Sequence, residues 1–143
     1  MKNIVRFLIM LILIVSYPVF SKSANSIPHS IPRGIYSYTQ KGDELIDGRE
    51  ASITWNINVK NNVDAVVTIS SWHAPFSCDG LYTISDEKDY VTLSWSREAN
   101  VDTMCDISSP QIFLKKSLSN GILIRSKLFP WGNEGWKNTN KIN

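Results

Sequence analysis

The stretch Ser52-Ile53-Thr54-Trp55-Asn56-Ile57-Asn58-Val59 (SITWNINV) alternates polar and apolar side chains without interruption. Successive side chains of a β-strand point to opposite faces of the sheet. The alternation therefore places the tryptophan and its aliphatic neighbours on one face and the serine, threonine and asparagines on the other. This pattern predicts a strand with one buried and one solvent-facing side.

Similar short runs follow one another along the chain, separated by turn-forming residues. The clearest are Gly34–Thr39, Ser52–Val59, Val63–Trp72, Leu81–Ile84, Val91–Ser96, Ile112–Leu114 and Ile122–Ile124. No sustained helical period occurs between Gly34 and Phe129. Tight turns between consecutive strands favour antiparallel pairing of neighbours. We predict an all-β fold, a single antiparallel meander of about seven or eight strands. We expect a small barrel because closure removes exposed edges, with a β-sandwich as the alternative.

The first residues have the features of a secretory signal peptide. A short cationic start precedes the apolar run Phe7–Val15, which is far shorter than the roughly 20 residues needed to cross a bilayer core. We predict cleavage after Ser21. The predicted segments are a signal peptide at 1–21, a flexible linker at 22–33, a β domain at 34–131 and a polar C-terminal tail at 132–143. We expect an exported protein, periplasmic or extracellular, with no membrane anchor after cleavage.

Cleavage also changes the net charge. The chain has 15 Lys and Arg against 13 Asp and Glu, and losing Lys2 and Arg6 with the signal peptide leaves 13 of each. A nucleic-acid-binding domain usually carries a basic surface, so we predict no nucleic-acid partner. The adjacent pair Lys115-Lys116 is interpreted as a solvated strand end.

The chain contains two cysteines, Cys78 and Cys105. In an oxidising compartment they allow one intramolecular pairing. We therefore predict a Cys78–Cys105 disulfide.

The stretch Ser70–Gly80 (SSWHAPFSCDG) brings serines, a histidine, a cysteine and an aspartate together. A catalytic triad needs a base within hydrogen-bond reach of the nucleophile and a carboxylate behind it, and His73 stands at a strand end beside proline. A zinc site needs three or four convergent ligands, and oxidation of Cys78 removes a thiolate. The carboxylates fall mostly in turns, where general-acid chemistry is not favoured. We predict neither catalytic residues, nor a metal, nor a cofactor.

Two tryptophans follow the last predicted strand. Trp131 is closest to that strand and is expected to fold back as a plug at one end of the barrel. Trp136 lies beyond Gly132 and Gly135, in a polar context, and is the better candidate for an exposed contact with a partner. Both are possible partner-contact residues.

The order and spacing of several segments resemble a family of small exported bacterial β domains of unknown function. The likeness rests on Gly34-x-Tyr36-x-Tyr38 and on the segments WNINV, VVTISSW, CDGLYTI, VTLSW and PQIFLKKSLSNGILIRS. It extends from Gly34 to Trp131 and implies the fold and the compartment. Gly34-Ile35-Tyr36 is also similar to the opening of lipocalin-type barrels.

Three functions follow from these features. The first is an exported, non-enzymatic and monomeric protein that binds an unknown protein partner, of the inhibitor or immunity type. The second is a carrier of a small apolar ligand inside a lipocalin-like barrel, which requires a continuous cavity lined by Trp55, Trp95 and Tyr36. A hydrolase is the least favoured.

Overall fold

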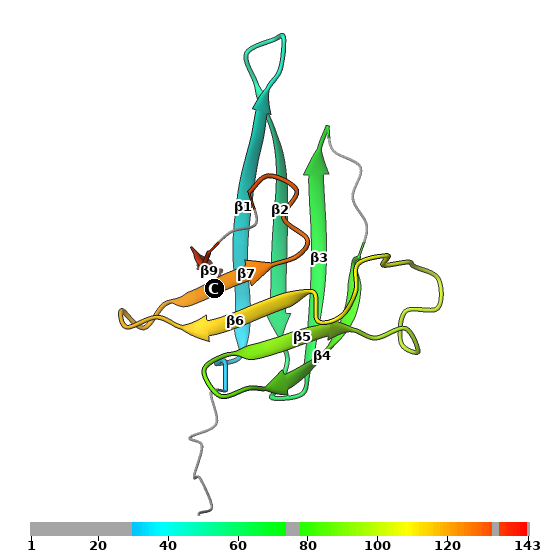
Figure 1. Cartoon of the computed structure of the whole chain (residues 1–143), viewed down its shortest axis with the longest axis vertical. Coiled ribbons are helices and arrows are strands. Elements are labelled where there is room, and N and C mark those ends of the chain that lie inside the picture. The colour runs from blue at the N-terminus through cyan, green and yellow to red at the C-terminus, as the bar shows by residue number, and fades with distance from the viewer. Residues whose placement is uncertain (1–29, 74–77, 133–134, 143) are drawn as a thin grey trace, which may run out of the picture.

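The computed structural model describes residues 30–73, 78–132 and 135–142, which form nine β-strands and no helix. The strands are β1 (Gly34–Glu44), β2 (Glu50–Val59), β3 (Asp64–Trp72), β4 (Gly80–Asp86), β5 (Val91–Trp95), β6 (Ile112–Lys116), β7 (Ile122–Ser126), β8 (Lys137–Asn138) and β9 (Asn140–Ile142). They pair antiparallel in one sheet, in the order β8-β7-β6-β5-β4-β3-β2-β1-β9 (Figure 1). The predicted antiparallel meander is confirmed. These described parts of the chain contain no helix that could cross a membrane.

One segment near the C-terminus nearly closes the sheet into a barrel. β8 pairs with β7 through Leu123 and Ile124, and β9 pairs with β1 through 35–37. Between them, the Thr139 backbone N–H and hydroxyl both donate to the Ile122 carbonyl, at 3.0 and 2.7 Å. The first and seventh strands of an alternating meander run in the same direction, so a further segment that pairs antiparallel with both can join them. This strand lies in the segment predicted to be a polar tail.

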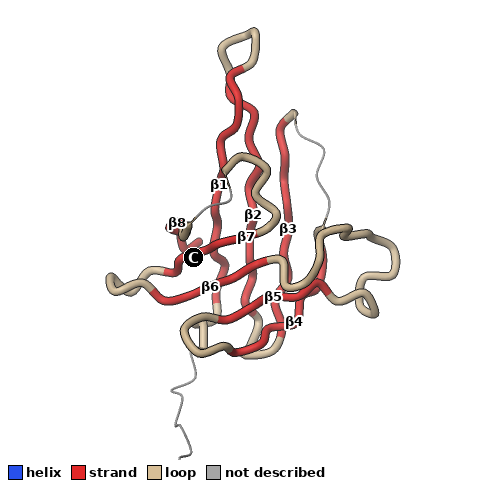
Figure 2. The backbone as a smooth tube through the Cα atoms, in the orientation of Figure 1, coloured by secondary structure: helices blue, strands red, loops and turns tan. Residues whose placement is uncertain are grey.

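The barrel has two walls that cross one another. β1, β2 and β3 are long, and β1 and β2 extend beyond the barrel to the β1–β2 turn, while β4 to β7 pass across them (Figures 1 and 2). The two walls join where β4 pairs with β3, through 64–67 only. From residue 68 to its end at Trp72, β3 pairs with β2 alone among the described strands.

Side chains fill the interior of the barrel. Every second residue of β2 is buried, as the alternation predicts, and Trp55 has no exposed surface. Its ring lies 4.8 Å from that of Phe129 and 6.1 Å from that of Tyr38, between ring centres. The opposite wall contributes further fully buried aliphatic residues, which are Leu93, Ile112, Leu114 and Ile124. Burying side chains of this size contributes about 1.5–3 kcal/mol each to folding.

The chain entering β1 covers one end of the barrel. Ile31 is 4% exposed and joins the core, and the Tyr36 hydroxyl donates to the Pro32 carbonyl at 2.7 Å. The last residues of the predicted linker therefore pack on the domain. The predicted signal peptide and the rest of the predicted linker lie outside the described residues.

The segment after β7 folds back over β1. Phe129 is buried, and Trp131 is partly buried against the core. The Gln40 amide receives the Trp131 N–H and donates to the Gly132 carbonyl, each at 3.4 Å. A Cβ at Gly42 would overlap the Trp131 ring, so glycine at this position permits the contact.

Trp136 holds the closing segment against the outer face of β6 and β7. Its ring centre lies 4.3 Å from the Lys115 ammonium and 5.1 Å from the Arg125 guanidinium carbon. The ring of Tyr90 approaches it from the start of β5, at 6.2 Å. Cation–π contacts of this kind contribute about 0.5–1 kcal/mol at exposed sites and more where water is excluded.

We therefore expect Trp136→Ala to lower the free energy of unfolding by about 1–2 kcal/mol, the sum of two such contacts. Urea unfolding of the disulfide-bonded protein measures this loss. Lys116→Ala is the matched control, because Lys116 is exposed and lies beside Lys115 in the same strand. A loss for Trp136→Ala no larger than that of the control would contradict the role given to the ring.

Candidate functional site

The connection between β5 and β6, residues 96–111, is the longest between successive strands. It contains no regular strand, and most of its residues are exposed. Long loops held on a rigid scaffold are frequent locations of binding residues. We call this segment the 96–111 loop.

A disulfide joins the middle of this loop to the residue two positions before β4. Cys105 is bonded to Cys78, 27 residues earlier, with their Cα atoms 4.5 Å apart. This confirms the predicted pairing. The Cys78 side of the bond is fixed by the core, because the buried Tyr82 hydroxyl donates to the Cys78 carbonyl at 2.7 Å. Burial, aided by the charge of Asp79, raises the pKa of Tyr82, so its hydroxyl keeps the proton that it donates.

The amide of Asn100 fastens the first half of the 96–111 loop. Its Oδ1 accepts the Leu81 N–H at 2.8 Å, and its Nδ2 donates to the carbonyls of Leu81 at 2.8 Å and Ser96 at 2.7 Å. Gly80 makes room for this amide, because a Cβ at that position would overlap it. Gly80 also has a φ of 129°, a conformation that side chains other than glycine rarely adopt.

The amide of Gln111 fastens the second half. Gln111 is 2% exposed. Its Oε1 accepts the Trp95 backbone N–H, and its Nε2 donates to the Ile107 carbonyl, both at 2.8 Å. The Trp95 indole N–H in turn donates to the Asp79 carbonyl at 3.0 Å. A buried amide satisfied in this way orders the backbone that it contacts, because leaving its partners unpaired costs about 1–3 kcal/mol each.

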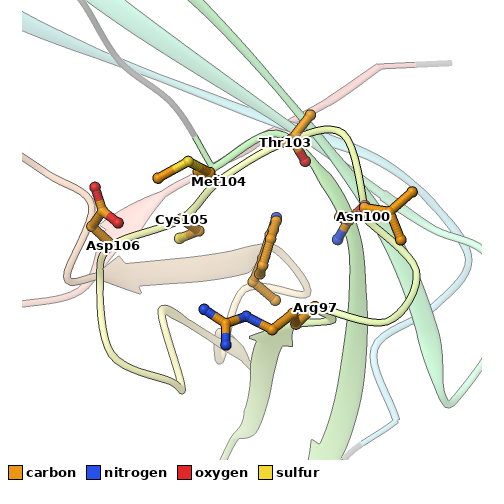
Figure 3. A pocket seen from close by; sticks show the side chains of 8 residues that line it. Arg97, Asn100, Thr103, Met104, Cys105 and Asp106 are labelled. Carbon is orange, nitrogen blue, oxygen red and sulfur yellow. The ribbon is translucent and has the colours of Figure 1, made fainter.

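A hollow of about 360 Å³ lies between this loop and the end of β5. It is lined by Trp95, Arg97, Asn100, Val101, Thr103, Met104, Cys105 and Asp106. Asn100 and Thr103 lie on one side of it and Cys105 and Asp106 on the other (Figure 3). Its size is at the lower end of the range for ligand pockets, so it is large enough for one or two side chains of a partner.

Apolar side chains of the 96–111 loop point into solvent beside the hollow. Val101 is 81% exposed, Met104 69% and Ile107 38%. Charged residues alternate with them, with Glu98, Asp102 and Asp106 opposed by Arg97. None of these four takes part in an ion pair with another described residue. The surface is thus apolar with a charged border, which resembles the composition of protein interfaces.

The Ser70–Gly80 stretch is divided between two places. His73 follows the end of β3 with a φ of 56°, and its ring lies edge-on to Trp72 at 4.1 Å. The Arg49 guanidinium stacks on the Trp72 ring. It also forms an ion pair and hydrogen bonds with Asp47, which hold the pKa of the Asp47 carboxyl below its ordinary value. Among the described residues, His73 makes no hydrogen bond to a hydroxyl. Residues 74–77 lie outside the described part of the chain.

Trp131 and Trp136 occupy different environments. Trp131 packs against the core beside Gly42, and Trp136 lies on the outer face of the barrel between Lys115 and Arg125. Both are partly buried. Whether either touches a partner remains a prediction.

Within residues 30–73, 78–132 and 135–142, no group of three or more His, Cys, Asp or Glu side chains is placed to hold a metal ion. Comparison of the chain with protein-family models, curated proteins and solved structures finds no match. The resemblance to small exported β domains therefore stays a prediction.

The amino-acid sequence alone does not identify the 96–111 loop as a site. The signal available in the sequence was the spacing of Val101, Met104 and Ile107 among acidic residues, with Pro110 before the next strand. A run of this kind shows that no strand forms there. It does not show which backbone groups Asn100 and Gln111 will contact.

Gly80→Ala should displace Asn100 and loosen the first half of the 96–111 loop. The added methyl group overlaps the amide, and the positive φ becomes strained, for a combined loss of stability of about 1–3 kcal/mol. Changes in the backbone amide NMR signals of Leu81 and of residues 96–104 would report the displacement. Gly121→Ala is the control, because its nearest neighbouring atom would be 3.9 Å away. Unchanged loop signals in Gly80→Ala would show that Asn100 does not depend on this glycine.

Proposed function

We propose that this protein is an exported, non-enzymatic binding protein whose partner is another protein, contacted through the 96–111 loop. The observation that carries the proposal is the combination of exposure and restraint in this loop. Val101 and Met104 are largely exposed, although the backbone beneath them is held by a disulfide and two amide side chains. A surface ordered before binding loses less conformational entropy when its partner arrives.

The filled interior also favours recognition on the outside. A carrier of the lipocalin kind needs a cavity between its walls. Here Tyr36 and Trp55 belong to the core, whereas Trp95 borders the external hollow. The hollow is open to solvent along the exposed part of the loop, a geometry better suited to side chains of a partner protein than to an enclosed small ligand.

The experiment compares Val101→Asp/Met104→Asp with Ile46→Asp as bait in envelope extracts. Ile46 is the matched control because it is 110% exposed and lies in the β1–β2 turn, remote in sequence from the loop. A photo-crosslinking residue at position 104, with position 46 as its control, identifies what touches the loop. Central apolar contacts in an interface contribute more than about 1 kcal/mol each, so we expect the double variant to weaken capture by at least tenfold.

The proposal is supported if one protein crosslinks from position 104 and is captured by the wild type and by Ile46→Asp but not by the double variant. Thermal unfolding of all three proteins checks that they are folded. Capture of the same proteins by all three baits, or no specific crosslink from position 104, would contradict the proposal. A small molecule retained by the wild type alone would favour the carrier instead.

A further inference from the structure

The neutral net charge of the predicted mature chain conceals a division between its two parts. Residues 22–106 contain seven Lys or Arg and twelve Asp or Glu, a net charge of −5. Residues 107–143 contain six Lys or Arg and a single acid, Glu134, a net charge of +5. The basic part therefore comprises β6, β7, β8 and β9.

The fold gathers this basic part on one side of the barrel. β6, β7 and β8 are neighbours in the sheet, and β9 continues the same closing segment. Lys115 and Arg125 lie on the outer face, where both contact Trp136. The ion pairs among the described residues are Lys41–Glu50 and Asp47–Arg49, so no carboxylate in the described part of the chain forms an ion pair with the cations of β6 and β7.

The turn between β6 and β7 adds an apolar residue to this charged surface. Leu118 is 109% exposed at the turn, two residues after the exposed Lys116. The turn projects from the side of the barrel (Figure 1). Trp136 and Tyr90 contact one another on the outer face of the barrel, beside Lys115. An exposed leucine and lysine, with a partly buried lysine and arginine near tryptophan and tyrosine, is the composition of surfaces that lie at a membrane interface.

We propose that the β6–β7 hairpin docks on an anionic phospholipid surface, with Leu118 entering the headgroup region, Lys115 and Arg125 on the outer face toward the lipid phosphates, and Lys116 beside the turn at the end of β6. Juxtamembrane cations are attracted by the negative surface potential of such a membrane. Burial of an apolar residue at the tip adds to that attraction. This surface is separate from the 96–111 loop, and the proposal does not depend on the proposed function.

Nucleic acid is the less suitable polyanion for this surface. Proteins that bind single strands offer open aromatic rings on which bases stack. The rings here are occupied by the protein's own cations, since Arg125 covers Phe113 at 4.7 Å and Lys115 covers Trp136. The exposed residue at the tip is instead leucine, which suits insertion among lipids.

The test measures sedimentation of the disulfide-bonded protein with vesicles of phosphatidylglycerol and phosphatidylcholine, and with vesicles of phosphatidylcholine alone. We expect binding to the anionic vesicles that falls as salt is added. Lys116→Gln should weaken binding about fivefold, the factor that corresponds to the attraction of one cation near the surface. Leu118→Ser should weaken it by a similar factor, because the inserted apolar side chain is lost.

Each variant has a control of the same type elsewhere on the barrel. Lys60→Gln replaces an exposed lysine in the β2–β3 turn, and Ile46→Ser replaces an exposed apolar residue in the β1–β2 turn. Both should bind as the wild type does. Failure to bind anionic vesicles, equal binding to both vesicle types, or equal losses in the controls would overturn the proposal. Binding of a single-stranded oligonucleotide that depends on Lys116, without vesicle binding, would also overturn it in favour of nucleic acid.

Discussion

The bond between Cys78 and Cys105 fixes the longest loop of the barrel to the buried core next to β4. In the chain-entropy view, linking two cysteines that are 27 residues apart in the sequence stabilises the folded state by about 3–4 kcal/mol. The bond also makes the position of the loop depend on the core. Cys78 and Asp79 are held from inside by Tyr82 and Trp95, so Cys105 and its neighbours take their position from the core. The exposed apolar side chains of the 96–111 loop thereby gain a fixed geometry that their own local sequence does not supply.

Much of the fold follows from local patterns in the sequence. The alternation around Trp55 predicts both the strand and its buried face, because a strand of period two leaves each residue only one of two sides. The closing strand was not predictable in this way. Residues 137–142 are mostly polar, and they form strands because β7 and β1, far apart in the chain, both present unpaired backbone groups to them. Ile31 belongs to the core for a similar reason, because the residues beside it come from turns that are far away in the sequence.

The candidate site was less predictable than the fold. The cysteine pairing followed from a count of two, but the reach of the Asn100 and Gln111 amides depends on where β4 and β5 bring their backbones. Charge was similarly misleading when summed over the chain. The predicted mature chain, with equal numbers of acids and bases, suggested no charged surface, yet the order of strands brings Lys115, Lys116 and Arg125 together in one hairpin. The two proposed surfaces thus arise from the same sheet, one from a restrained loop and the other from neighbouring basic strands.

We infer that the 96–111 loop is ordered before any partner binds. Backbone ¹⁵N relaxation of the isolated, disulfide-bonded protein measures this directly on the picosecond-to-nanosecond timescale. We expect order parameters for residues 100–107 close to those of the flanking strands, about 0.85. Values below about 0.6, typical of a flexible loop, would contradict it.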